Sequence, residues 1–270
     1  MSARIFFVAM LLAISMVASD SAVMAQEQAQ TAVQAQALDQ HALDLLKQMS
    51  DTISQAKTVS FQARSMVPVR TPNGTWINLY GTSQVIIQGP DKLFARTAGD
   101  LAPYDFYFNG KTITVYSPAK NLYAVKSAPD TIDDMIGEAY REEGRSFPYA
   151  DILVSEPYKV LTEGLTSALY VGQSTILPLS GAGSVKTDHL VLSNKGVEWQ
   201  IWIDTRDHLP RMVCATYLDD ASEPSYTVEF WGWKLNAPVS AEAFIFNNAS
   251  QAPKVEFRNP VERSRGQRTK

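Results

Sequence analysis

The feature that most constrains the fold of this chain is a series of short segments in which apolar and polar side chains alternate with a period of two. In the segment 59–64, Val59, Phe61 and Ala63 alternate with polar residues, a pattern typical of a strand with one buried and one solvated face. Because few helical segments separate these strands, we expect them to pair antiparallel, and about ten of them in one sheet curl into a barrel or partial barrel. The other alternating segments are 75–88, 91–98, 103–108, 111–117, 122–127, 185–192, 197–203, 210–218 and 225–235.

A turn signal fixes the expected register of one hairpin. Asn109 and Gly110 form a dipeptide that strongly favours a two-residue turn between strands, and bulky apolar residues alternate on both sides of it. With this turn at the centre, apolar side chains of both strands share one face. The predicted pairs are Phe108 with Lys111, Phe106 with Ile113, and Tyr104 with Val115.

The segment 197–203 indicates which face of its strand is buried. Trp199 and Ile201 belong to an apolar face, and polar residues alternate with them. A turn leads into the next strand, where Met212 and Cys214 are expected to continue the same apolar face. Cys214 is therefore predicted to be a small core residue.

Two helical segments are expected to cover the sheet. Residues 38–56 repeat apolar side chains at spacings of three and four, which gives one apolar stripe. An insertion at about 129–164 begins with a helix, for which Asp130 is the expected N-cap and Gly144 the stop signal. Short helices are expected to follow at 148–153 and 157–161, and the apolar stripe of the first helix is formed by Ile132, Met135, Ile136, Ala139 and Tyr140.

The two ends of the chain are expected to lie outside the folded domain. Residues 1–25 combine a basic start, an apolar stretch of 14 residues and small residues before Ala25, as in a signal peptide rather than a membrane span, which needs about 20 residues. We therefore predict export to the periplasm, cleavage near Ala25, a flexible leader at 26–37 and a domain over 38–258. The basic tail at 259–270 either frays or makes a transient contact with anionic lipid.

The sequence shows no motif for catalysis, metal binding or a cofactor. The formal net charge of −4 argues against a nucleic-acid partner, and a single cysteine excludes an intrachain disulfide. His41, His189 and His208 fall on three different predicted elements, without the spacing of metal ligands. We therefore expect neither an enzyme nor a cofactor; an enzyme would require His189 to face a pocket near Asp188 or Glu198.

Bulky side chains are concentrated on the predicted strands. Aromatic residues make up 10% of the chain, and a strongly curved sheet needs helices to fill its concave side. Either the side chains meet in a filled core, or a hydrophobic cleft remains that a lipid-like ligand enters. The predicted cleft walls on the sheet are Phe106, Phe108, Ile113, Val115, Trp199, Ile201, Met212 and Phe230, and those on the helical lid are Ile132, Met135, Ile136 and Tyr140.

Several short motifs follow one another in a distinctive order between Ala42 and Phe257. They are Phe-Tyr-Phe-Asn-Gly-Lys at 106–111, Tyr-Ser-Pro at 116–118, Asn-Leu-Tyr at 121–123, Ala-Asp-Ile-Leu at 150–153, Asp-His-Leu at 188–190, Glu-Trp-Gln-Ile-Trp-Ile at 198–203, Leu-Pro at 209–210, Trp233, and Phe-Ile-Phe at 244–246. In these motifs the chain resembles a periplasmic protein family of unknown function in the LolA/LolB-like lipoprotein-carrier superfamily. The resemblance implies an α+β fold, mainly antiparallel β: a single curved, open half-barrel sheet of about ten strands, with helices covering its concave side.

Two functions of different classes fit these observations. The leading hypothesis is a soluble periplasmic binding or carrier protein for a hydrophobic ligand, either a lipid or a lipidated protein, held between the curved sheet and the helical lid. The alternative is a protein-interaction or sensor module with a filled core, which docks another envelope protein and binds no small molecule. The enclosed volume discriminates between them, since an apolar cleft on the order of several hundred Å³ favours carriage.

Overall fold

The computed structural model describes residues 38–143, 149–177, 181, 183–248 and 250–257. The chain divides into two units, residues 1–38 and residues 39–270, and all described residues except Leu38 belong to the second unit. The predicted signal peptide, the leader, the helix stop at Gly144 and the basic tail lie outside the described residues.

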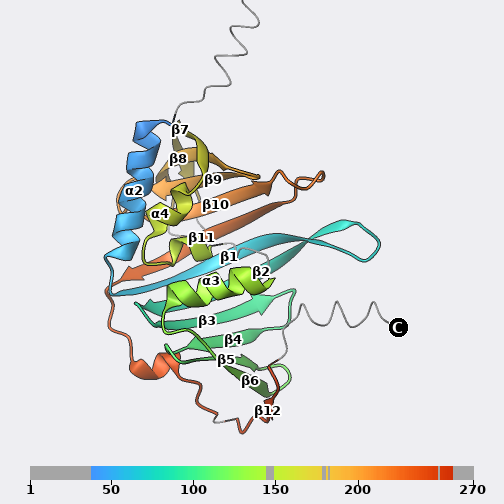
Figure 1. Cartoon of the computed structure of the whole chain (residues 1–270). Helices are drawn as coiled ribbons and strands as arrows, with labels where there is room; N and C mark the ends of the chain where they lie inside the picture. The colour runs from blue at the N-terminus through green and yellow to red at the C-terminus, as the bar shows by residue number, and fades with distance from the viewer. Residues whose placement is uncertain (1–37, 144–148, 178–180, 182, 249, 258–270) are drawn as a thin grey trace, which may run out of the picture. The chain divides into compact units, whose positions relative to one another are not determined.

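The second unit is built on one open, curved sheet of 12 strands (Figure 1). Strands β1 to β6 form one antiparallel meander and β7 to β11 form another, and the antiparallel pairing of β1 with β11 joins the two. Only β12 pairs parallel, with β6, among the described strands. Across the sheet the order is β12 (Lys254–Val255), β6 (Leu122–Ser127), β5 (Thr112–Ser117), β4 (Tyr104–Phe108), β3 (Lys92–Gly99), β2 (Trp76–Gln88), β1 (Thr58–Arg70), β11 (Ser225–Leu235), β10 (Pro210–Tyr217), β9 (Val197–Asp204), β8 (Val185–Asn194) and β7 (Leu165–Ile176).

This strand order carries the helical insertion across the whole sheet. The insertion leaves β6 near one edge and enters β7 at the opposite edge, so it has to cross a face of the sheet. Its residues Ile132, Met135 and Ile152 are buried in the same core cluster as Phe61 and Phe230 of the sheet. The helices over this core face are α2 (Gln40–Ser54), α3 (Ile132–Glu143), η1 (Ala150–Ile152) and α4 (Pro157–Thr162).

The predicted fold class, mainly antiparallel β with a few helices, is confirmed, but the sheet has 12 strands rather than about ten. The sequence interpretation missed β7 and the two-residue β12. In β7 the alternating pattern is weak, because Leu169 and Val171 are exposed at the sheet edge and the register shifts between Tyr170 and Gly172. A bulge of this kind interrupts the period-two signal.

The hairpin between β4 and β5 forms, but the predicted register is wrong by two residues. Phe108 pairs with Ile113 and Phe106 with Val115, so the loop is longer than a two-residue turn. The Asn109 side chain explains this: its Oδ1 accepts hydrogen bonds from the backbone N–H groups of Lys111 (3.1 Å) and Thr112 (3.0 Å). A shift of two residues keeps every side chain on its face, and Phe108 and Ile113 are buried together as expected.

The prediction that Met212 and Cys214 of β10 lie on the apolar core face is wrong. A register shift between Pro210 and Met212 places Val213 opposite Ile201, and Met212 opposite Trp202. Because a one-residue shift turns the following side chains to the other face of a sheet, Met212 and Cys214 lie on the outer face. Cys214 is half-buried there, with its Sγ 3.4 Å from the Ser225 Oγ, and is not a core residue.

Helix α3 begins one residue later than expected. The hydroxyl oxygen of Thr131 accepts a hydrogen bond from the backbone N–H of Asp134 (3.1 Å) and donates one to the Asp134 carboxylate (2.8 Å). Thr131 is therefore the N-cap in place of Asp130. The first helix and the two short helices after α3 occur where the sequence predicted them.

Candidate functional site

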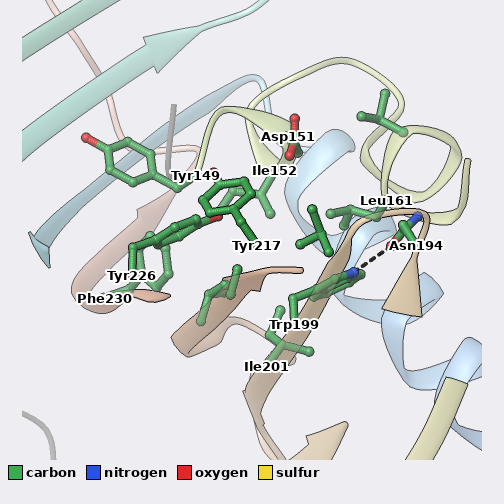
Figure 2. A pocket seen from close by; sticks show the side chains of 14 residues that line it. Tyr149, Asp151, Ile152, Leu161, Asn194, Trp199, Ile201, Tyr217, Tyr226 and Phe230 are labelled. Atoms are coloured by element: carbon green, nitrogen blue, oxygen red, sulfur yellow. Dashed lines mark hydrogen bonds between the residues drawn. The ribbon is translucent and has the colours of Figure 1, made fainter. Parts of the chain in front are cut away.

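The candidate site on the core face is an apolar pocket of about 180 Å³ between the sheet and the cover formed by η1 and α4 (Figure 2). Three neighbouring strands, β9, β10 and β11, supply its floor. The lining residues are Tyr149, Asp151, Ile152, Val160, Leu161, Asn194, Val197, Trp199, Ile201, Val213, Ala215, Tyr217, Tyr226 and Phe230.

The floor of the pocket follows from the register of β9 and β10. Val213 pairs with Ile201 and Ala215 with Trp199, so large and small side chains face each other in pairs. Ala215 fills little of the space beside Trp199 because its side chain is a single methyl group. The shift in β10 therefore creates the hollow: without it, Met212 in place of Val213 would lie opposite Ile201.

The cover is anchored to the sheet by a short chain of hydrogen bonds. The Nε1–H of Trp199 donates to Oδ1 of Asn194 (2.7 Å), and the Nδ2–H of Asn194 donates to the carbonyl oxygen of Glu163 directly after α4 (2.7 Å). Figure 2 shows the first of these bonds at the edge of the pocket. Asn194 thus links the indole ring of Trp199 in the pocket wall to the backbone of Glu163 at the end of the cover.

A polar group is located at the η1 side of the pocket. The Tyr140 hydroxyl donates a hydrogen bond of 2.5 Å to Oδ1 of Asp151. Burial raises the pKa of the Asp151 carboxyl, and this hydrogen bond opposes the rise only in part. In Figure 2 Asp151 lies on the opposite side of the pocket from Trp199 and Ile201.

Two tyrosines of β10 and β11 lie near this polar group. Tyr217 and Tyr226 are in ring contact, with centroids 5.9 Å apart. Burial raises the pKa of Tyr226, and the nearby Tyr217 and Asp151 add to the effect. The Tyr226 hydroxyl therefore remains protonated at neutral pH and is a hydrogen-bond donor.

The pocket brings together only part of the residue set that the sequence predicted. Trp199, Ile201 and Phe230 line it, and Tyr140 reaches its edge through Asp151. Met212 lies on the outer face, where it borders a separate hollow of about 130 Å³. The remaining predicted residues belong to the packed core or to its margin beneath α3: Phe106, Phe108, Ile113, Val115, Ile132, Met135 and Ile136.

The sequence interpretation missed most residues of the cover and two tyrosines of the floor. Tyr217 and Tyr226 fall on predicted strands, and the alternating pattern of β11 places Tyr226 on the same face as Phe230, so a signal for Tyr226 existed. Val213 and Ala215 gave no such signal, because only the bulge in β10 turns them inward.

His189 lies away from the pocket, on the outer face of β8. Its ring stacks on Trp202, with centroids 4.2 Å apart, and its Nε2 is 3.0 Å from Oε1 of Gln200. Asp188 accepts a hydrogen bond from the Tyr170 hydroxyl (3.0 Å). Within the described part of the chain, no group of three or more His, Cys, Asp or Glu side chains is arranged to hold a metal ion, and none of the described helices is both long and apolar enough to span a bilayer.

The fold and the pocket define an α+β protein in which a large open antiparallel sheet and a helical cover enclose an apolar site. The chain belongs to the family described as predicted periplasmic protein (DUF2092), whose model matches residues 42–258. Among curated proteins, none matches this chain.

Several solved structures are similar to this chain at low identity. An uncharacterized conserved protein from Thermus thermophilus is 11% identical, with a TM-score of 0.45, over 80% of this chain and 99% of that chain. The lipoprotein LppX from Mycobacterium tuberculosis is 15% identical, with a TM-score of 0.41, over 75% and 98%. A LolA superfamily protein from Nitrosomonas europaea is 9% identical, with a TM-score of 0.33, over 76% and 97%.

Proposed function

We propose that this protein is a periplasmic binding protein that holds a short apolar group, such as the end of an acyl chain of a lipid or lipidated protein, between β9–β11 and the cover of η1 and α4. The observation that carries the proposal is the apolar pocket beneath this cover. Trp199, Ile201 and Phe230 are walls of the pocket, and the family to which the chain belongs is described as periplasmic.

The size of the pocket limits what it encloses. Its volume of about 180 Å³ is below the several hundred Å³ that would favour carriage, and below the roughly 300–1,000 Å³ typical of sites for drug-sized ligands. The proposal is therefore limited to a short apolar group and does not extend to enclosure of a whole lipid. At about 30 Å³ per water-sized group, it holds roughly six such groups, and a methylene group is of similar size. Burying six methylenes contributes roughly 5 kcal/mol before the costs of association, so we expect weak, reversible binding.

The cover is built in a way that permits the pocket to open further. The 3-10 helix η1 has three residues and α4 has six, lengths at which a helix depends on packing rather than on its own stability. Val160 on α4 is 38% exposed although it lines the pocket. A longer acyl chain is accommodated if α4 moves away from β9.

A fluorescence experiment tests the proposal. N-phenyl-1-naphthylamine is an uncharged probe that becomes fluorescent in apolar surroundings. It is expected to bind the wild-type protein by placing its phenyl ring in the pocket, with the larger naphthyl group at the opening beside the exposed Val160. Val213→Phe fills the pocket with an aromatic ring and is expected to abolish the signal. Met212→Phe makes a similar change one residue away on the outer face, and is expected to leave the signal unchanged.

The result that contradicts the proposal is equally specific. A wild-type protein that does not enhance probe fluorescence, or a Val213→Phe variant that retains full enhancement while folded by circular dichroism, shows that the pocket is not a binding site. Native mass spectrometry of protein from the periplasm, followed by organic extraction, then identifies the bound lipid. The same spectrum tests export, since cleavage near Ala25 gives a mature chain that begins at Gln26.

A second candidate function is the docking of another envelope protein. The observation that favours it is the edge of the sheet, where β7 is the terminal strand. Leu169 and Val171 on β7 are 41% and 52% exposed, and Leu177 directly after β7 is 82% exposed.

Asp39 already forms hydrogen bonds with the backbone of Ala168 (3.0 Å) and Tyr170 (3.1 Å) at this edge. The part of β7 from Val171 onward is therefore the part expected to pair with an extended segment of a partner. Periplasmic protein that carries no extractable lipid and does not bind the probe would favour docking.

A further inference from the structure

The described lining of the pocket contains acidic and neutral polar groups but no basic ones. Among the described residues that line it, none is Lys, Arg or His. The ionisable side chains are Asp151 and the tyrosines Tyr149, Tyr217 and Tyr226. An anionic group that entered this site would lose its hydration without gaining a cationic partner from this lining, which is strongly unfavourable in an apolar environment.

The carboxyl group of Asp151 further disfavours the binding of an anion in the pocket. Asp151 is half-buried, and its hydrogen bond from Tyr140 is already short at 2.5 Å. Burial raises the pKa of Asp151, so the surroundings oppose even this one negative charge. A second negative charge in the same pocket would be opposed by both the surroundings and the carboxylate.

Tyr226 supplies a hydrogen-bond donor for a neutral ligand. Among the described residues, none forms a hydrogen bond with its hydroxyl group, whereas the Tyr149 hydroxyl is 3.2 Å from the Ser83 Oγ. Figure 2 shows Tyr226 among the pocket-lining side chains, and its ring contacts that of Tyr217, with centroids 5.9 Å apart. The Tyr226 hydroxyl group is not one of the described buried polar atoms that lack a partner, so it is accessible to water. An oxygen atom of a ligand in the pocket can replace that water as the acceptor.

We infer that the pocket selects the uncharged end of an amphiphile, an alcohol, ester or amide oxygen on an alkyl chain, and rejects a free carboxylate or phosphate. The Tyr226 hydroxyl donates to the ligand oxygen, and the lack of a cation beside Asp151 in the described lining excludes the anion. This inference rests on the proposed function, because it names the chemical class of ligand for the same pocket.

The test measures displacement of N-phenyl-1-naphthylamine by octan-1-ol and by n-octane, with wild-type protein and the Tyr226→Phe variant. The variant is expected to bind octan-1-ol roughly threefold to tenfold more weakly, the effect of one neutral hydrogen bond, and to bind n-octane as the wild type does. Tyr116→Phe, on β5 and outside the pocket lining, controls for effects on stability. Equal loss for both ligands, or no loss for octan-1-ol, overturns the role of Tyr226.

The rejection of anions is tested with octanoate at pH 7.5. Octanoate is expected to displace the probe from the wild type far more weakly than octan-1-ol does, because the described lining offers its carboxylate no cation. Val160→Lys places an ammonium group at the rim of the pocket and is expected to raise octanoate affinity roughly twofold to fivefold, the range for an exposed ion pair. Val160→Gln, a neutral residue of similar length, is expected to leave it unchanged.

The outcomes separate this inference from the proposed function. If the wild type binds the probe and Val213→Phe does not, the pocket is a binding site; octanoate that then competes as strongly as octan-1-ol overturns the inference alone. If the probe does not bind the wild type, the proposed function fails first.

Discussion

At the scale of single residues, Asp204 is a carboxylate that the fold buries completely. Two arginines contact it: Arg211, whose side chain is 11% exposed, at 2.8 Å, and Arg206, whose side chain is 74% exposed, at 3.3 Å. Arg211 also contacts Asp207. Because a buried charge that loses its partner remains without solvation, the two arginines are expected to differ in importance although they share one partner.

Arg211→Met tests this difference. The variant leaves Asp204 buried beside the exposed Arg206 alone, and is expected to lose about 3–5 kcal/mol of the free energy of unfolding. Urea denaturation at pH 7 measures it. Arg206→Met is the matched control with a smaller expected loss, because the Arg206 side chain is mostly solvated and its backbone N–H, which donates to Oδ1 of Asp204 at 2.9 Å, remains in the variant. Equal losses in the two variants would show that the burial of an arginine beside Asp204 does not determine how much the ion pair adds to the free energy of unfolding.

The same carboxylate predicts how stability depends on pH. Burial acts to raise the pKa of Asp204, but hydrogen bonds from Arg206 and the charge of Arg211 outweigh it, so the pKa lies below its usual value. The unfolded chain therefore binds this proton more readily, and the contribution of Asp204 is present above about pH 4 and is lost as the pH falls. Urea midpoints between pH 3 and 6 are expected to fall less steeply in Arg211→Met than in the wild type.

At the scale of elements, the N-terminus of α3 has two adjacent candidates for the N-cap residue, and a hydrogen bond identifies which of them caps the helix. Asp130 and Thr131 both have side chains suited to an N-cap, and the hydroxyl of Thr131 is the group that meets the N–H of Asp134. Asp133 at the start of the helix accepts hydrogen bonds from the backbone N–H of Ser155 (2.9 Å) and from its hydroxyl (2.5 Å). The start of α3 is thereby fastened to the segment that leads to α4.

Thr131→Ala is expected to reduce the free energy of unfolding by about 1 kcal/mol, because the N–H of Asp134 loses its acceptor. Thr131→Ser keeps the hydroxyl and is expected to retain most of the stability. Asp130→Ala is the control at the adjacent position and is expected to have little effect in the same urea titration. A larger loss in Asp130→Ala than in Thr131→Ala would restore Asp130 as the cap.

At the scale of the whole molecule, the two parts of the insertion leave the core filled to different extents. Ile132, Met135 and Ile136 of α3 are 3–7% exposed and belong to the packed core. Beneath η1 and α4 the pocket remains. The insertion covers both parts, because it runs from β6 near one edge of the sheet to β7 at the opposite edge.

Ile136→Ala and Leu161→Ala distinguish a filled part from an open one. Ile136→Ala creates a new cavity in the packed core and is expected to cost about 2–5 kcal/mol. Leu161→Ala enlarges an existing pocket, so the cavity contributes less and the loss is expected to be smaller. Urea denaturation with unchanged m values provides the comparison, and a larger loss in Leu161→Ala would contradict the open pocket.

Much of the architecture could be predicted from the sequence, because it depends on local patterns. The alternation of residues 197–203 correctly placed Trp199 and Ile201 on the buried face, and the spacing of apolar residues correctly placed α2 and α3. The candidate site was predicted only in part: three of its sheet walls were identified, whereas Met212 was assigned to the wrong face.

The sequence by itself determined the fold class, the helices and the apolar face of most strands, since a period of two or 3.6 residues is set by neighbours along the chain. Only the tertiary structure decided the bulge beside Pro210, the crossing of the insertion over the sheet, and the place where the core stays open. These depend on how side chains from distant segments fill a shared space. No local period encodes that volume, because Ala215 and Trp199 leave room only once β9, β10 and α4 have packed together.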